Sequence, residues 1–149
     1  MNRDFAEMLA ALSAAGADYL LVGAHALAAH GVVRATGDMD VWVRATPENA
    51  SKVWRALLAF GAPLQELTER DLATPELVFQ IGVAPYRIDL LTSIDGVSFE
   101  EAWTHRTTVR VEGHEIPLIG RADLLRNKRA TGRLRDLADA EELEKLATP

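Results

Sequence analysis

Two aspartates separated by a single residue, Asp38 and Asp40, are the sharpest chemical feature of this sequence. Residues 38–43 alternate with the period of a β-strand, and side chains two apart on a strand leave the same face. Two carboxylates held so close repel each other unless a cation lies between them. Magnesium suits that place because it binds carboxylate oxygens together with substrate phosphates. The pattern predicts a metal site for phosphate chemistry; a solvated strand end is the alternative for this motif alone.

A third carboxylate, Asp89, lies among apolar neighbours in residues 86–91, which read as another strand. A buried carboxylate without a partner is costly, so it must meet a cation, a hydrogen-bond donor or water. One possible partner is Arg87 on the same face, and another is a metal ion. Three carboxylates on adjacent strands would form a two-metal site for phosphoryl transfer, with Asp38, Asp40 and Asp89 as metal ligands and catalytic groups.

Gly23 follows a short apolar run over residues 19–22, read as a buried strand, and precedes an alanine-rich helix over residues 24–30. The first turn of a helix offers free N–H groups and a partial positive charge, which suit a phosphate. Glycine would let that backbone approach the phosphate closely. The alternative is an ordinary strand-to-helix turn.

The remaining pattern alternates helices with strands. Thr46 and Pro47 are typical of a helix start, as N-cap and first helical residue. Residues 66–75 read as irregular, with a helical turn. The other predicted helices cover residues 5–15, 47–60, 99–103, 121–130 and 134–146, and the other predicted strands cover 77–81, 107–111 and 115–119, the last two as a hairpin. This arrangement predicts an α+β protein.

Composition limits the class of protein. The 149 residues suit one domain over 1–149, and 48% hydrophobic with 26% charged residues allows a packed core, which excludes disorder as the main state. A net charge of -6 argues against coating nucleic acid through charge alone. The absence of cysteine excludes disulfides, thiolate metal sites and a cysteine nucleophile. No secretion signal or membrane-spanning run is present, so we expect a cytoplasmic protein.

Taken together, these motifs resemble the nucleotidyltransferase superfamily, the fold of polymerase-beta-like enzymes. Its signature is two small residues after a strand, then a short helix, a pair of acids on the next strand and a third acid later. More closely, the chain resembles small bacterial members related to AbiEii-type toxins. The similar stretches cover nearly the whole chain and are residues 22–26, 34–41, 87–92, 127–129 and 132–139.

This resemblance implies a mixed central β-sheet flanked by helices, with further helices at the C-terminus. It implies a magnesium-dependent transferase that moves a nucleoside monophosphate from a triphosphate such as ATP to an acceptor hydroxyl and releases pyrophosphate. The acceptor would be RNA such as a tRNA end, a protein or a small molecule. The family pattern also implies two magnesium ions at the three aspartates.

Further residues would bind the nucleotide. The resemblance implies a phosphate ligand at Lys128 and an acidic brace at Asp136 and Asp139, whereas a surface lysine and a solubilised helix face are the alternatives. Arg34 would contact phosphate or pair with Asp38. Gly23 and its neighbours Ala24 and His25 would surround the phosphates.

One residue departs from the family signature. The second small residue is Ala24, where the family has glycine or serine, so a serine hydroxyl is missing unless His25 replaces it. This departure leads to an alternative function, a catalytically weak module that binds nucleotide or a partner in a toxin–antitoxin pair. A cognate antitoxin or a second subunit would then be its partner.

Overall fold

The computed structural model describes residues 1–34 and 37–146. The sequence also predicts a turn over residues 34–37, which lies partly outside the described residues. Among the described helices, none is long and apolar enough to cross a membrane.

A six-stranded mixed sheet forms the centre, in the order β3-β4-β2-β1-β6-β5. β2 pairs in parallel with β4 and β1 with β6, whereas the other neighbours are antiparallel. The predicted strands are confirmed, although five residues of the predicted ranges lie just outside them: Asp38, Leu77, Tyr86, Arg87 and Ile119. The strands are β1 (Tyr19–Val22), β2 (Met39–Val43), β3 (Val78–Ile81), β4 (Ile88–Leu91), β5 (Thr107–Val111) and β6 (His114–Leu118).

Helices connect and cover these strands, and their ends follow local chemistry. The Thr46 side chain accepts a hydrogen bond from the Asn49 backbone, Pro47 begins the helix, and Gly61 ends it in the left-handed conformation. The helices are α1 (Arg3–Ala14), α2 (Gly23–Ala29), α3 (Pro47–Phe60), the 3-10 helix η1 (Glu69–Ala73), α4 (Phe99–Thr104), α5 (Arg121–Thr131) and α6 (Leu134–Leu146).

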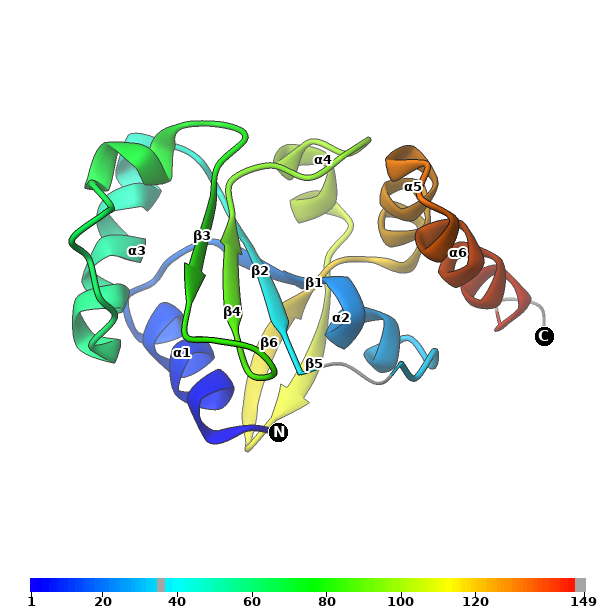
Figure 1. Ribbon diagram of the computed structural model, residues 1–149, viewed down its shortest axis with the longest axis horizontal. Helices are drawn as coiled ribbons and strands as arrows, with labels where there is room; N and C mark the ends of the chain where they lie inside the picture. The colour runs from blue at the N-terminus through cyan, green and yellow to red at the C-terminus, as the bar shows by residue number, and fades with distance from the viewer. Residues whose placement is uncertain (35–36, 147–149) are drawn as a thin grey trace.

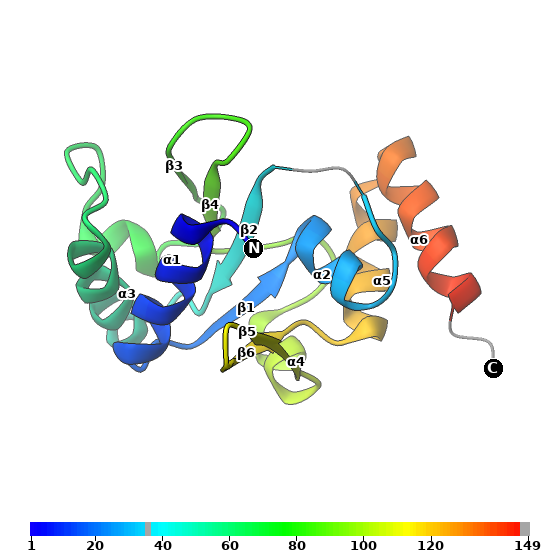
Figure 2. The ribbon, with the colours of Figure 1, turned by 90° about the horizontal axis from the view of Figure 1, so that it is seen from below.

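The helices gather at two sides of the sheet. In Figures 1 and 2, α1 and α3 lie together on one side, and α5 and α6 lie together at the opposite end beside α2. The sheet passes between these groups, and β1 carries the chain from α1 to α2 (Figure 2). The mixed α+β architecture and the two C-terminal helices are as predicted.

The core lies between the sheet and α1 and α3. It includes Met8, Leu12, Leu21, Val41 and Leu57, each at most 2% exposed. Burial of these side chains supplies most of the driving force for folding.

Trp42 is buried on the opposite face of the sheet from Val41. It shares the strand face of Asp40, yet it is 1% exposed and packs edge-on against Phe99 at a centroid distance of 5.0 Å. A base could not stack on it. Trp42 therefore has the packing role that is the usual fate of tryptophan.

Candidate active site

Asp40 and Asp89 are directly opposite each other on neighbouring strands. β2 and β4 run parallel, and their register pairs Asp40 with Asp89. Cross-strand partners project from the same face of a sheet, so both carboxylates leave together. Asp38 comes one residue before β2 and borders the same cleft. The fold thus brings the three predicted carboxylates to one place.

Arg87 links two of these carboxylates. Its Nε donates to Asp89 Oδ1 at 2.7 Å and its Nη2 to Asp89 Oδ2 at 3.1 Å, a bidentate pair. The same Nη2 lies 3.3 Å from Asp38 Oδ2, and the backbone N–H of Arg87 donates to Asp38 Oδ1 at 3.1 Å. The salt bridge considered from the sequence is therefore present, and it extends to Asp38.

Asp40 is in a different electrostatic state. Burial, and next the negative charge of Asp89, raise the pKa of the Asp40 carboxyl from 3.8 to about 6; Lys128 opposes this shift. Arg87 binds Asp89 and Asp38 directly, whereas its effect on Asp40 is weaker. A cation bound beside Asp40 would therefore stabilise its ionised form.

Gly23 is required by packing against Asp40. Its φ of +68° lies in the left-handed region, and a Cβ at this position would lie 3.0 Å from both Cβ and Cγ of Asp40 and closer still to Oδ2. Glycine here lets the β1–α2 turn lie against the carboxylate. The pattern of strand, glycine and helix thus has a structural cause at the site.

Charged side chains from α5, α6 and the segment before β2 line the same cleft as the carboxylates. Lys128 Nζ lies 3.1 Å from Asp136 Oδ1 and 3.6 Å from Asp139 Oδ2. Arg34 Nε donates to Asp139 Oδ1 at 2.7 Å, so Arg34 has Asp139 as its partner. Burial acts to raise the pKa of Asp136, but hydrogen bonds from Thr131, Lys128 and Arg133 outweigh it and lower that pKa.

These groups line one cleft of about 410 Å³, which we call the carboxylate cleft. Its described lining includes Asp139, and also Arg133 and Arg135, for which the sequence allows either an acceptor-binding surface or a plain helix face. A basic run around a helix break was the available signal. The lining is Gly23, Ala24, Arg34, Asp38, Asp40, Arg87, Asp89, Lys128, Arg133, Arg135, Asp136 and Asp139.

His25 is the predicted nucleotide ligand that does not belong to this set. It is not among the described residues that line the cleft. Its ring packs edge-on against Phe5 of α1 at 5.4 Å, and burial lowers its pKa, opposed by a hydrogen bond with the Asp38 backbone. His25 therefore supports the segment that carries Asp38 without lining the cleft itself.

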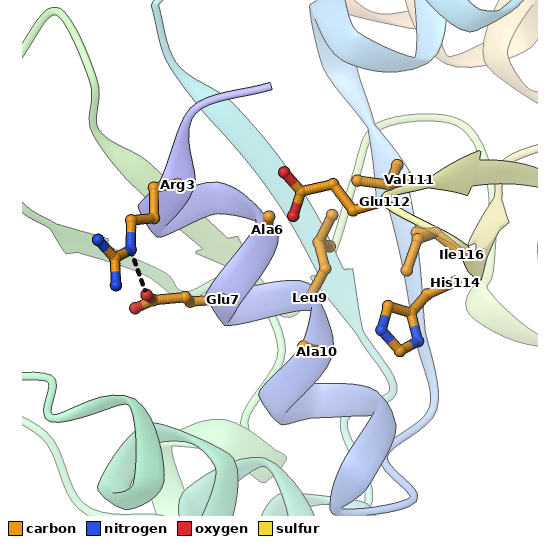
Figure 3. Close-up of a pocket in the computed structure, with 9 residues that line it drawn as sticks. All are labelled: Arg3, Ala6, Glu7, Leu9, Ala10, Val111, Glu112, His114 and Ile116. Atoms are coloured by element: carbon orange, nitrogen blue, oxygen red, sulfur yellow. Dashed lines mark hydrogen bonds and ion pairs between the residues drawn. The ribbon is translucent and has the colours of Figure 1, made fainter.

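Two further hollows help to delimit the site. One, the adjoining hollow, has a volume of about 460 Å³ and shares Gly23, Asp40, Asp89, Lys128, Arg133 and Asp136 with the carboxylate cleft. The other, of about 240 Å³, lies between α1 and the β5–β6 hairpin (Figure 3). Its described lining has no residue in common with the carboxylate cleft, and its one ion pair joins Arg3 to Glu7 across a helical turn. The candidate catalytic and binding groups therefore lie in the carboxylate cleft and the adjoining hollow.

The carboxylate oxygens suit magnesium in kind, but their present partners limit the fit. No group of three acidic or histidine side chains in residues 1–34 and 37–146 is arranged to hold a metal ion. The Arg87 guanidinium instead contacts both Asp38 and Asp89. A hard cation would relieve the repulsion between Asp40 and Asp89, and binding it through all three aspartates requires Arg87 to withdraw.

Comparison with known proteins shows the fold. No protein-family model and no curated protein sequence matches the chain. A nucleotidyltransferase structure from Thermotoga maritima superposes with a TM-score of 0.63 at 14% identity, covering 96% of this chain and 89% of that one. The lincosamide antibiotic adenylyltransferase LnuA, bound to lincomycin, gives 0.61 at 14% identity, with 99% and 98% covered. An antigenic nucleotidyltransferase-like protein from Paracoccidioides brasiliensis gives 0.54 at 17%, with 98% and 77% covered. The chain thus has a nucleotidyltransferase fold.

Proposed function

We propose that this protein is a magnesium-dependent nucleotidyltransferase that moves a nucleoside monophosphate from a nucleoside triphosphate to an acceptor hydroxyl. The observation that carries the proposal is the pairing of Asp40 with Asp89 across two parallel strands, with Asp38 beside them, in a cleft that also contains cationic side chains. The likeness in fold to nucleotidyltransferases supports it.

The cations of the carboxylate cleft would bind the triphosphate. Arg34, Lys128, Arg133 and Arg135 line this cleft together with the aspartates. Lys128 and Arg34 are held in place by Asp136 and Asp139, so their positions are fixed before substrate arrives. Preorganised cations beside a phosphoryl group stabilise the charge that develops during transfer.

The aspartates would serve the reacting atoms. Asp38 and Asp40 would hold magnesium, and Asp89 would complete a second metal position after Arg87 withdraws. Magnesium bound there would offset the negative charge of the phosphates. The acceptor oxygen would form a bond to the α-phosphorus as the bond to the β-phosphate oxygen breaks and pyrophosphate leaves. The acceptor proton would pass to a carboxylate oxygen of Asp89.

Transfer of label tests this proposal. The protein is incubated with magnesium, a host extract and ATP labelled at either the α- or the γ-phosphorus. We expect α-label to become attached to an acceptor and γ-label to appear in pyrophosphate. Asp40→Asn and Asp89→Asn should abolish the transfer, whereas the surface control Glu66→Gln should not. Attachment of γ-label instead would identify a kinase and refute the proposal.

The alternative is a module that binds nucleotide with little turnover. Ala24 favours it, because this residue lines the carboxylate cleft and its methyl group cannot hydrogen-bond a phosphate. In that case the labelled nucleotide would bind, depend on Asp40, and remain intact.

The finer family assignment extends the proposal. The motifs from Arg87 to Thr92 and from Gly132 to Asp139 suggest the AbiEii-toxin-like branch, with a cognate antitoxin or second subunit as partner. A cytoplasmic location is a separate part of the proposal. Co-purification of the protein with the product of a neighbouring gene tests that partnership.

A further inference from the structure

The adjoining hollow shares the Asp40–Asp89 pair with the carboxylate cleft, but it lacks three of the cations of the cleft. The carboxylate cleft has five cationic and five acidic side chains in its described lining. The described lining of the adjoining hollow has four acidic residues and only Lys128 and Arg133 as cations. Both of these cations are shared with the cleft and paired with Asp136. The two spaces therefore differ in the charge that they can accept.

The floor of the adjoining hollow is one face of the sheet. Gln80 of β3 pairs with Asp89 of β4, which pairs with Asp40 of β2, so an amide and two carboxylates form a row across three strands. Two residues further along, Val78 pairs with Leu91 on the same face. Val78 is 54% exposed although it is apolar. An occupant would meet polar groups at one end and apolar ones at the other.

The wall of the hollow is the loop after β4, and it is held firmly against α5. The Asn127 side chain donates to the Asp95 backbone oxygen at 2.9 Å. Gly96 has a φ of +79°, and a Cβ there would lie 2.5 Å from the Ala130 Cβ, so only glycine allows this approach. Ile94 and Asp95 of this loop border the hollow. A wall fixed in this way is typical of a preformed small-molecule site.

Charge argues against nucleic acid as the occupant. Proteins bind a phosphodiester backbone mainly with lysine and arginine. The residues that belong to the adjoining hollow alone include Asp95 and no described cation. A volume of about 460 Å³ lies in the range of small-molecule pockets.

From these observations we infer that the adjoining hollow binds the acceptor, and that the acceptor is a small, non-anionic hydroxyl compound with an apolar part. Its hydroxyl lies at Asp89, and its apolar part lies over Val78, Leu91 and Ile94. This inference rests on the proposed function and deepens it by selecting one acceptor class out of three.

The test combines separation of the products with a variant that fills the hollow. Label from ATP labelled at the α-phosphorus is followed into the dialysable small-molecule, RNA and protein fractions of a host extract. Val78→Trp places an indole in the hollow at an exposed position. Leu58→Trp is the matched control, because Leu58 of α3 is 58% exposed and is not among the residues described for the hollow. Binding of a fluorescent ATP analogue is measured for each protein.

We expect label in the dialysable fraction, a loss of about tenfold or more in that transfer for Val78→Trp, and normal transfer for Leu58→Trp. Binding of the ATP analogue should be unchanged in both. Label in RNA or protein would overturn the inference while leaving the proposed function intact. Weaker binding of the analogue by Val78→Trp alone would place the nucleoside in this hollow and also overturn it. Label in no fraction would instead refute the proposed function, and this inference with it.

Discussion

Replacing Asp40 with asparagine should stabilise the protein at neutral pH while it removes a carboxylate of the proposed site. Burial and the nearby charge of Asp89 raise the pKa of Asp40 to about 6. The cause is that the folded protein holds this negative charge poorly. Asparagine has nearly the same shape and no charge, so it removes the free-energy cost of a buried negative charge beside Asp89. Sites shaped for function often reduce stability in this way.

The magnitude follows from linkage between protonation and folding. A pKa of 3.8 in the unfolded chain and about 6 in the folded one corresponds to about 3 kcal/mol. Because the pKa of Asp40 is higher in the folded state than in the unfolded chain, the protonated carboxyl favours folding. This contribution is fully present below about pH 4 and is lost as the pH rises through about 6. The advantage of asparagine over Asp40 should therefore be near zero at about pH 4 and approach 3 kcal/mol at about pH 8.

Urea unfolding followed by circular dichroism measures this difference. The wild type, Asp40→Asn and the exposed-residue control Glu66→Gln are compared at both pH values. The control should follow the wild type at each. An Asp40→Asn protein that is no more stable than the wild type at the higher pH would refute the reasoning, as would an advantage of equal size at both. Saturating magnesium should reduce the advantage, because it stabilises the ionised aspartate.

Three other substitutions test separate contacts. Gly23→Ala should lower the free energy of unfolding by about 2 kcal/mol and impair nucleotide transfer, because of its positive φ and the closeness of Asp40; unfolding and transfer assays that show neither effect would contradict this. Arg87→Gln should tighten Mn²⁺ binding several-fold, measured by electron paramagnetic resonance, because the guanidinium no longer competes for Asp38; weaker binding would argue against that competition. Asn49→Ala should cost about 3 kcal/mol through three lost hydrogen bonds, yet leave transfer per folded molecule unchanged.

The sequence pattern predicted the helices and strands and indicated the three aspartates as candidate site residues. Alternation and the two-residue spacing of Asp38 and Asp40 indicated β2 and its acidic pair. Asp89 was a candidate because it lies among apolar neighbours. The pairing of Asp40 with Asp89 could not be predicted from either strand, because β2 bonds to β4 across a long connection and β3 lies outside both. Only the tertiary register places the two carboxylates opposite each other.

Local reasoning failed where the direction of a side chain depends on packing. His25 is two residues after Gly23 in the chain, but α2 is oriented so that the His25 ring packs against Phe5. Arg133 and Arg135 surround a helix start, and their position in the cleft follows from how α6 packs on α5. Helix packing angles are not encoded in a run of basic residues.

A crystal structure of the protein with Mn²⁺ and a non-hydrolysable ATP analogue tests the central claim most directly. We predict an anomalous peak from manganese at the carboxylates of Asp38 and Asp40, with Arg87 displaced and the triphosphate against Lys128 and Arg34. A nucleotide bound elsewhere, such as the hollow between α1 and the β5–β6 hairpin, or a cleft in which Arg87 keeps both carboxylates and no manganese enters, would contradict the account.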